Sequence, residues 1–370
     1  MKKALVLGVG SAQVDIIRYL KSDDWWVIGC SYQNAGQGLK YVDQFELVDI
    51  QDHYGLEKLG RKEKIDLIYS IGSDLAMPTI ARTASALGLP SFVSYETSSL
   101  LHNKILFRDF LTAHNISAIK YRGVRTRGDL DGWNCFPAIV KPSDNQGQRG
   151  VFLAGSIYDI DVRFESTISL SRSGTLIIEE YLEGSEVSAN AFVVDGEVLF
   201  CEVSDRLVFE NFSGGIPKSH VLPTKTCADD MLFETKELVK RCIRALAIEN
   251  GPVYFQIKLT SEGPRIIEVA PRLDGCHLWR LIKTVGGVDL LEASIKLLTG
   301  DRSVNLQMKE KAADYHLNFL FSPPEKEFRL MDHPAPIGVS CLEYYYNDGE
   351  IVRPINGSLE KVGYYIEREK

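Results

Sequence analysis

The segment Ile-Ile-Glu-Glu-Tyr-Leu-Glu-Gly-Ser-Glu, residues 177–186, carries the pattern from which the fold can be read. Its apolar start belongs to a predicted strand, Thr175–Tyr181, and its end is an acidic turn that contains a glycine. Taken alone, the pair Glu179-Glu180 is typical of a solvated charged surface. Its interpretation therefore depends on what precedes and follows it in the chain.

Basic side chains precede this segment at the edges of two predicted elements. Lys141 ends the predicted strand Phe136–Lys141, and Lys104 lies near the start of the predicted helix Asn103–His114. A lone lysine of this kind is more often a surface residue whose aliphatic stem covers apolar neighbours. The polar, glycine-containing loop 143–150 follows Lys141, and alone it reads as a hairpin turn.

A carboxylate follows the segment, between apolar residues near the end of a strand. The predicted strands Val253–Thr260 and Pro264–Ala270 form a hairpin, and Glu268 lies near the end of the second strand. A carboxylate beside a buried strand end needs a cationic partner, so this position is less ordinary than the others. Arg272 follows it directly after a proline.

The order and spacing of these elements resemble the ATP-grasp superfamily over roughly residues 1–300. The resemblance is nearest to ligases whose metal site is like that of the carbamoyl-phosphate synthase large subunit, although this chain is far too short to be that whole protein. It implies an enzyme that uses ATP to activate a carboxylate as an acyl phosphate for attack by an amine, with release of ADP.

The resemblance assigns Lys104 and Lys141 to the phosphates of ATP, for which a compact ammonium charge is well suited. The loop 144–150 corresponds to a flap that closes over the triphosphate, where glycines let backbone N–H groups approach. Arg149 adds positive charge to that loop.

The resemblance also makes Glu179–Leu182 the hinge that reads the adenine edge, through the Glu180 carbonyl and the Leu182 amide. The Glu179 side chain is expected near the adenine amino group, and Glu186 is expected to accept hydrogen bonds from the ribose. The implied ATP-binding residues are Lys104, Lys141, Gln146, Gly147, Gly150, Glu179, Glu180, Tyr181, Leu182 and Glu186.

Gln256 and Glu268 correspond to the family's positions for Mg²⁺, or Mn²⁺, on paired strands. One or two protein ligands are enough, because phosphates and water complete the octahedron. A third position, usually Asn, is Ala270 here, which leaves open whether one metal or two bind. Arg272 and Lys141 are the implied catalytic cations that steady the transferring γ-phosphoryl group.

Residues for the other substrates are harder to identify. Asp74 ends a predicted strand of the first domain, where open α/β sheets bind ligands. Arg206 or Arg280 can hold a carboxylate through two hydrogen bonds, and His277 can orient a nucleophile. For each arginine a surface or ion-pair role is an equally good reading, and a lone histidine is more often structural.

Strands that alternate with helices predict a Rossmann-like, parallel N-terminal sheet. The expected fold is α/β, with an α+β ATP-grasp part. The predicted domains are residues 1–98, the two-lobed ATP-grasp domain 99–300 with a lid at about 117–181, and a small β-rich C-terminal appendix at 301–370. The N-terminal strands are expected at Lys3–Leu7, Trp26–Cys30, Ile65–Ile71 and Ser91–Ser94, with helices at Ala12–Leu20 and Pro78–Leu87, and the C-terminal strands at His316–Phe321, Ile337–Tyr346 and Val362–Glu367.

The turn Gly8-Val9-Gly10 after the first strand raises the alternative of a dinucleotide-binding oxidoreductase. The third position of that fingerprint is Gln13, and no acidic residue ends the second strand, which runs into Cys30-Ser31. The fingerprint is therefore incomplete, and a tight strand-to-helix turn is the preferred reading.

The composition is that of a globular protein, with 45% hydrophobic and 25% charged residues over 370 residues. A net charge of −8 gives no reason to expect nucleic acid or an anionic membrane as partner. The apolar run at the N-terminus is too short for a signal peptide, and no later run predicts a membrane span. Seven scattered cysteines without a Cys-x-x-Cys pair predict reduced thiols and a cytoplasmic location.

The expected partners are therefore small carboxylate and amine substrates, and a homodimer is compatible with the sequence. Two other functions remain open. Gln13 and Gln256 favour carbamate or carboxyphosphate chemistry, and Ala270 favours a nucleotide-binding module without turnover. The sequence names neither the acid nor the nucleophile, and residues 301–370 carry no readable motif.

Overall fold

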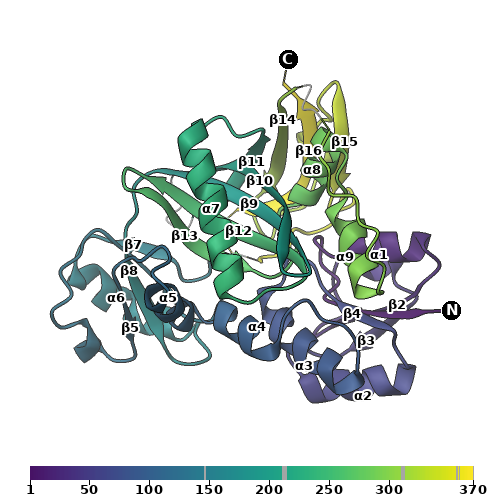
Figure 1. The fold of residues 1–370 in the computed structure, drawn as a ribbon, viewed down its shortest axis with the longest axis horizontal. Helices are drawn as coiled ribbons and strands as arrows, with labels where there is room; N and C mark the ends of the chain where they lie inside the picture. The colour runs from purple at the N-terminus through teal and green to yellow at the C-terminus, as the bar shows by residue number, and fades with distance from the viewer. Residues whose placement is uncertain (146, 211–214, 310–312, 356, 358, 370) are drawn as a thin grey trace.

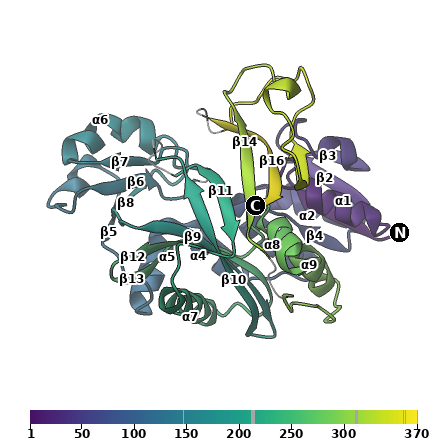
Figure 2. The ribbon, with the colours of Figure 1, turned by 90° about the horizontal axis from the view of Figure 1, so that it is seen from above.

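The computed structural model of this chain describes residues 1–145, 147–210, 215–309, 313–355, 357 and 359–369. These residues form three β-sheets. In Figure 1 the N-terminal sheet lies at the lower right, a small sheet lies at the left, and the largest sheet stands between and above them. Figure 2 shows from above that the largest sheet continues into the yellow C-terminal strands.

The N-terminal sheet is parallel, in the order β3-β2-β1-β4. Residues 4–7 of its central strand are buried, as expected when helices cover both faces of a parallel sheet. The Rossmann-like prediction for this part of the chain is confirmed. The strands are β1 (Lys3–Leu7), β2 (Trp26–Ser31), β3 (Gln44–Leu47) and β4 (Leu67–Tyr69), and the helices are α1 (Val14–Ser22), α2 (His53–Glu63) and α3 (Met77–Leu87).

The glycine turn after β1 is held by a side chain. Gln13 accepts a hydrogen bond from the Gly10 amide through Oε1 at 3.0 Å, and its Nε2 donates to the carbonyl of Ile71 just beyond β4. Gln13 is buried, so it ties the turn to the neighbouring strand end. This arrangement fits the tight-turn reading.

The predicted strand Ser91–Ser94 is wrong, because this segment leads into the helix α4 (Tyr95–His102). The Ser94 hydroxyl accepts from the Thr97 amide at 3.0 Å, which satisfies a donor at the helix start. Phe92 packs edge-on against Tyr69 with 5.5 Å between ring centroids. The apolar residues of this segment therefore fill the core without pairing in a sheet.

The small sheet is antiparallel, in the order β5-β8-β6-β7, and the helix α6 packs against it. The helix α5 (Lys104–Ala113) precedes it and is capped by Asn103, whose Oδ1 accepts from the amides of Ile105 and Leu106. This cap fixes the position of Lys104 in the first turn. The elements of this unit are β5 (Tyr121–Val124), β6 (Ala138–Pro142), β7 (Phe152–Ala154), α6 (Ile157–Ile168) and β8 (Leu176–Glu180).

The largest sheet has the order β13-β12-β9-β10-β11-β14-β16-β15. Its C-terminal strands form no separate sheet, since β14 pairs with β11 through registers such as Ser219↔Asn318. The predicted β-rich character of the C-terminal part is confirmed, but its strands extend the largest sheet. The strands are β9 (Ser185–Val194), β10 (Glu197–Val208), β11 (Pro217–Leu222), β12 (Gly251–Thr260), β13 (Gly263–Ala270), β14 (Tyr315–Ser322), β15 (Val339–Tyr344) and β16 (Glu360–Arg368).

The remaining helices pack on this sheet and join it to the N-terminal unit. One apolar core contains Ile16 of α1, Leu281 of α8 and Tyr364 of β16, so three distant parts of the chain share it. These helices are α7 (Asp229–Ala245), α8 (Leu278–Gly286) and α9 (Leu290–Leu298), with short 3-10 turns at Leu39–Tyr41, Asp74–Ala76, Arg127–Leu130 and Leu330–Asp332. Among the described residues no helix is long and apolar enough to cross a bilayer.

Candidate active site

A cleft of about 1020 Å³ collects side chains from all three sheets. Most of the sequence-predicted ATP and metal residues line it, so elements far apart in the chain meet at one site. Gly150 does not line it, and Gln146 lies outside the described residues. The predicted residues in the lining are Lys104, Lys141, Gly147, Glu179, Glu180, Tyr181, Leu182, Glu186, Gln256, Glu268 and Arg272, together with Asp74 and Arg206.

A buried carboxylate holds the strand lysine in place. Glu179 lies 2.5 Å from Nζ of Lys141 and 2.7 Å from Nε of Arg108. Burial alone would raise the pKa of Glu179, but the two cations outweigh it and lower the pKa to about 2. The ammonium of Lys141 is thereby fixed at the cleft wall, and the adenine contact expected of the Glu179 side chain stays a prediction.

Arg108 is a site residue that the sequence reading missed. Its guanidinium is buried and also donates to the carbonyls of Ile266 and Ile267, at 2.7 and 3.2 Å. It therefore connects α5, β8 and β13 behind the cleft. The sequence does contain one indication of its role: Arg108 lies four residues after Lys104, which places both side chains on one face of a helix.

Lys104 enters the cleft from the first turn of α5. Its Nζ donates to the Asn145 carbonyl at 2.6 Å, and its backbone amide donates to the Ser143 carbonyl at 2.9 Å. Burial lowers the pKa of Lys104, and the charge of Lys141 acts in the same direction while Glu268 opposes it. An anion bound between Lys104 and Lys141 would offset the burial and the repulsion that lower this pKa.

The loop after β6 is held at both of its ends. Asp144 accepts hydrogen bonds from the Ser171 hydroxyl at 2.7 Å and the Ser173 amide at 2.8 Å. Nε2 of Gln148 reaches across the cleft to the Gly215 carbonyl at 2.8 Å. The loop thus lies over the cleft, as a flap would.

Gly150 is required for packing below this loop. Its φ is +75°, and a Cβ atom there would lie 2.8 Å from Cδ1 of Leu170. A side chain at this position would therefore be strained by the left-handed backbone and would require Leu170 to move. Its predicted contact with ATP stays a prediction.

The predicted hinge crosses between the two antiparallel sheets. The Tyr181 amide donates to the Pro137 carbonyl at 3.1 Å, whereas the Leu182 amide has no hydrogen-bond partner within the described part of the chain. Gly184 follows with φ +137°, and a Cβ atom there would lie 1.9 Å from the Leu259 carbonyl oxygen. The glycine therefore allows the chain to pass directly against β12 and leaves the Leu182 amide in the cleft wall.

Glu186 is surrounded by donors of the chain itself. It pairs with Nη1 of Arg206, lies 3.3 Å from Nζ of Lys258, and accepts from Nε2 of Gln256 at 2.9 Å. Arg206 also donates to the Gly215 carbonyl at 3.1 Å. Its guanidinium is thus occupied, and its substrate role stays a prediction.

Gln256 and Glu268 are direct cross-strand partners in β12 and β13, as the hairpin predicted. With Nε2 of Gln256 donating to Glu186, its side-chain oxygen is left for another partner beside the Glu268 carboxylate. One carboxylate and one amide oxygen fit Mg²⁺, which retains water and phosphate ligands. No cluster of three or more acidic, His or Cys side chains suited to a metal occurs among the described residues.

The N-terminal domain reaches the site through Asp74. Its carboxylate accepts two hydrogen bonds from Arg272, from Nε at 2.7 Å and from Nη2 at 2.6 Å. Arg272, the predicted catalytic cation, is therefore hydrogen-bonded to Asp74, a predicted substrate residue that lies 198 positions away in the sequence.

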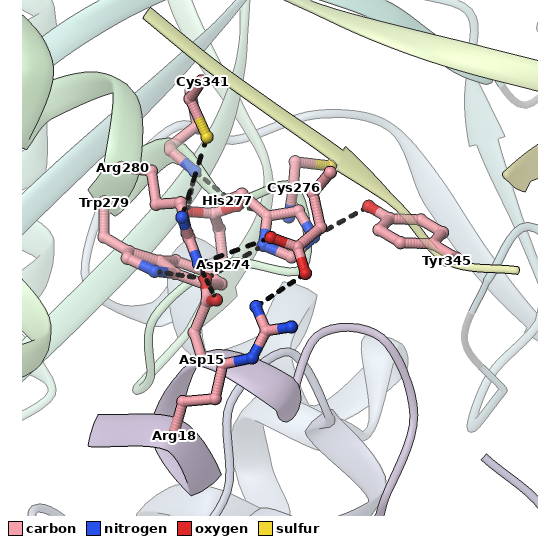
Figure 3. Close-up of polar contacts among 11 residues, drawn as sticks. Asp15, Arg18, Asp274, Cys276, His277, Trp279, Arg280, Cys341 and Tyr345 are labelled. Carbon is pink, nitrogen blue, oxygen red and sulfur yellow. Dashed lines mark hydrogen bonds and ion pairs between the residues drawn. The ribbon is translucent and has the colours of Figure 1, made fainter. Parts of the chain in front are cut away.

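His277 and Arg280 lie behind this end of the cleft, around the buried carboxylate of Asp15 (Figure 3). Arg280 donates to Asp15 from Nε at 2.8 Å, and the indole N–H of Trp279 donates to it at 3.1 Å. Nδ1 of His277 lies 3.4 Å from the same carboxylate. Neither His277 nor Arg280 lines the cleft, and their substrate roles stay predictions.

A family model described as an ATP-grasp domain matches residues 134–278, the span from β6 to the start of α8. That span contains the hinge, the strand lysine and the paired strands of the cleft. These residues form an ATP-grasp domain. The prediction from the sequence is confirmed at this level.

Three curated relatives of this chain are ligases or synthases. It is 24% identical over 272 residues to an L-arginine-specific L-amino acid ligase of Bacillus subtilis, which covers 70% of this chain and 64% of the relative. It is 22% identical over 318 residues to dapdiamide A synthase of Enterobacter agglomerans, covering 80% and 73%. It is 31% identical over 202 residues to a phosphoribosylamine–glycine ligase of Methanococcus vannielii, covering 47% and 43%.

Solved structures share the fold over the whole chain. The L-amino acid ligase of Bacillus licheniformis has a TM-score of 0.81 at 16% identity, covering 100% of this chain and 93% of that one. Phosphoribosylglycinamide synthetase of Anaerococcus prevotii has a TM-score of 0.75 at 20% identity, covering 100% and 94%. By sequence, however, the chain spans only 43% to 64% of several curated relatives that it matches.

Proposed function

We propose that this protein is an ADP-forming ligase that activates a carboxylate with ATP and joins it to an amine. The observation that carries the proposal is the single cleft lined by Lys104, Lys141, Glu186, Glu268 and Arg272. These groups come from separate elements, and each suits one part of a nucleoside triphosphate. The names of the three curated relatives support the same reaction class.

In the first step a carboxylate oxygen of the acid attacks the γ-phosphorus, and the bond to the ADP oxygen breaks. Lys104, Lys141 and Arg272 balance the negative charge that spreads over the phosphoryl oxygens, and no covalent enzyme intermediate is needed. Mg²⁺, or Mn²⁺, held by Gln256 and Glu268, supplies further positive charge to the phosphates when bound.

In the second step the amine nitrogen attacks the acyl carbon. The carbon–nitrogen bond forms, the carbon–oxygen bond to phosphate breaks, and the proton lost by the amine leaves with the phosphate. The flap that Gln148 holds across the cleft would exclude water, which otherwise hydrolyses the acyl phosphate.

The test is steady-state ADP release with Mg²⁺ over a panel of acids and amines. An acid-dependent and amine-dependent release of ADP is the expected result. Release with bicarbonate but with no amino acid would point to carboxyphosphate chemistry, which Gln256 favours. If ATP binds but no ADP is released under any condition, the result would favour a nucleotide-binding module without turnover, the alternative suggested by Ala270.

A cytoplasmic location and a homodimer are part of the same proposal. The seven cysteines are free thiols, and a dimer is named for one solved structure of this fold, the biotin carboxylase domain of Hydrogenobacter thermophilus. Sedimentation of the purified chain at several concentrations tests the assembly.

A further inference from the structure

The cleft extends past Arg272 to an end to which the C-terminal strands contribute. Cys276, Tyr345 and Lys361 line this end, and they come from the loop before α8, from the residue after β15 and from β16. None of these residues has a part in the proposed binding of ATP or metal. The C-terminal strands therefore extend the sheet and also form one wall of the site.

Lys361 presents an ammonium group to this end of the cleft. Its Nζ lies 3.4 Å from Sγ of Cys276 and 3.6 Å from the ring centroid of Phe319. Within the described part of the chain no carboxylate forms an ion pair with it. Burial lowers the pKa of Lys361, the contact with Cys276 opposes this, and the charge of Arg206 lowers the pKa further while the carboxylate of Asp274, beyond ion-pair distance, raises it.

Three other cations of the cleft are neutralised by carboxylates of the chain itself. Lys141 pairs with Glu179, Arg206 pairs with Glu186, and Arg272 pairs with Asp74. A partly buried ammonium with only a thiol and a ring beside it is costly, and an anionic ligand would offset that cost.

Tyr345 presents a hydrogen-bond acceptor close by, which follows from a chain of contacts visible in Figure 3. Burial favours protonation of Asp15, but Arg280 and His277 hold its pKa well below the usual range, so the carboxylate only accepts. Nδ1 of His277 must therefore donate to Asp15. Its other ring nitrogen, Nε2, lies 2.8 Å from the Tyr345 hydroxyl, so the two groups form a hydrogen bond.

The Tyr345 hydroxyl is thus held in place by His277. Burial raises the pKa of Tyr345 well above its ordinary value, so the hydroxyl remains protonated. What Tyr345 offers to the cleft is an oxygen lone pair. His277, held with a φ of +58° at the start of α8, fixes this orientation without reaching the cleft.

We propose that this end of the cleft is the subsite for the amine substrate, and that it selects an amine that also carries a carboxylate, as an α-amino acid does. The carboxylate pairs with Lys361, and an N–H of the amine donates to Tyr345, which aims the nitrogen lone pair at the acyl carbon. This inference rests on the proposed ligase function and adds the chemical class of its second substrate.

The experiment uses hydroxylamine, a small neutral nucleophile that traps an acyl phosphate without needing a carboxylate site. The wild-type chain is first screened with ATP, Mg²⁺, hydroxylamine and each standard amino acid as the acid, with hydroxamate as the readout. Lys361→Met and Lys218→Met, an exposed lysine of β11 outside the cleft, are then compared with L-alanine and L-alaninamide as amines.

For Lys361→Met we expect the KM for L-alanine to rise about tenfold or more, the size expected when a charge-assisted contact is lost. The KM for L-alaninamide and the rate of hydroxamate formation should stay unchanged, and Lys218→Met should match the wild type throughout. Equal KM changes for the two amines, or no change for L-alanine, would overturn the subsite.

Tyr345→Phe provides an independent test if Lys361→Met does not fold. It should raise the KM of both amines by the same factor and leave hydroxamate formation intact, because the hydroxyl contacts the shared amine. An unaltered KM for both amines would contradict the role of Tyr345. Absence of hydroxamate with every acid in the wild type would instead refute the ligase proposal, and the subsite would fall with it.

Discussion

Arg272 and Asp74 form a two-point ion pair, with both hydrogen bonds between 2.6 and 2.7 Å, although 198 positions separate them in the chain. The pair joins the segment after β13 to the 3-10 turn at the edge of the N-terminal sheet. Arg272 is buried, so its charge depends on this carboxylate until a phosphate arrives. The N-terminal domain therefore takes part in the site through one side chain.

Replacing Asp74 with alanine should destabilise the protein and make it depend on its ligand. A buried guanidinium left without its partner costs about 3–5 kcal/mol. Urea unfolding should show that loss in the absence of ATP, and ATP with Mg²⁺ should restore more stability to Asp74→Ala than to the wild type. Asp52→Ala, which changes an exposed helix cap on α2, serves as the control. Equal ligand-induced gains in both variants would contradict the exchange of partners at Arg272.

Glu179 predicts a pH dependence of stability. Its pKa is lowered from an ordinary 4.5 to about 2 in the folded chain, so its contribution is complete above pH 4.5 and declines as the pH falls toward 2. The difference corresponds to about 3 kcal/mol. In Glu179→Gln the free energy of unfolding should therefore decrease less between pH 4.5 and pH 2 than in the wild type. Glu57→Gln, which changes the i,i+4 partner of Arg61, should leave this pH dependence unchanged. If Glu179→Gln leaves the pH dependence of unfolding below pH 4.5 unchanged, other carboxylates determine it.

Regular elements with strong apolar patterns were predictable from the sequence. The strand Lys3–Leu7 agrees in both bounds, and the helix predicted at Asn103–His114 lies at Lys104–Ala113. Convergence of Lys104, Lys141 and Glu268 on one cleft also followed from the family pattern, because that pattern encodes a fold as well as a site.

Long-range partners were not predictable. The spacing of charges along the chain gives no indication that Arg272 pairs with Asp74 across 198 positions, or that Arg280 pairs with Asp15 across 265 positions. Such pairs depend on how the N-terminal part packs against the rest of the chain. The strand expected at Ser91–Ser94 failed for a local reason, since Ser94 caps a helix and Phe92 packs in the core.

The metal assignment makes a prediction about Mg²⁺ dependence. Glu268→Ala should remove Mg²⁺-supported ADP release at normal Mg²⁺ concentrations, because a single carboxylate faces Gln256 on the paired strand. Glu262→Ala changes a carboxylate at the exposed tip of the same hairpin and should behave as the wild type. A Mg²⁺ titration of ADP release compares the variants, with circular dichroism as the check on folding. Full activity of Glu268→Ala at normal Mg²⁺ would count decisively against the assignment.

The hinge allows a test that separates a backbone group from a side chain. Leu182→Pro removes the amide that the structure leaves in the cleft wall, whereas Leu182→Ala keeps it and removes most of the side chain. If this amide reads the adenine, loss of one hydrogen bond should weaken ATP binding about tenfold in Leu182→Pro. Inorganic triphosphate, which lacks the base, should bind both variants alike. Calorimetry with both ligands measures this directly, and equal ATP affinities in the two variants would show that the adenine is recognised elsewhere.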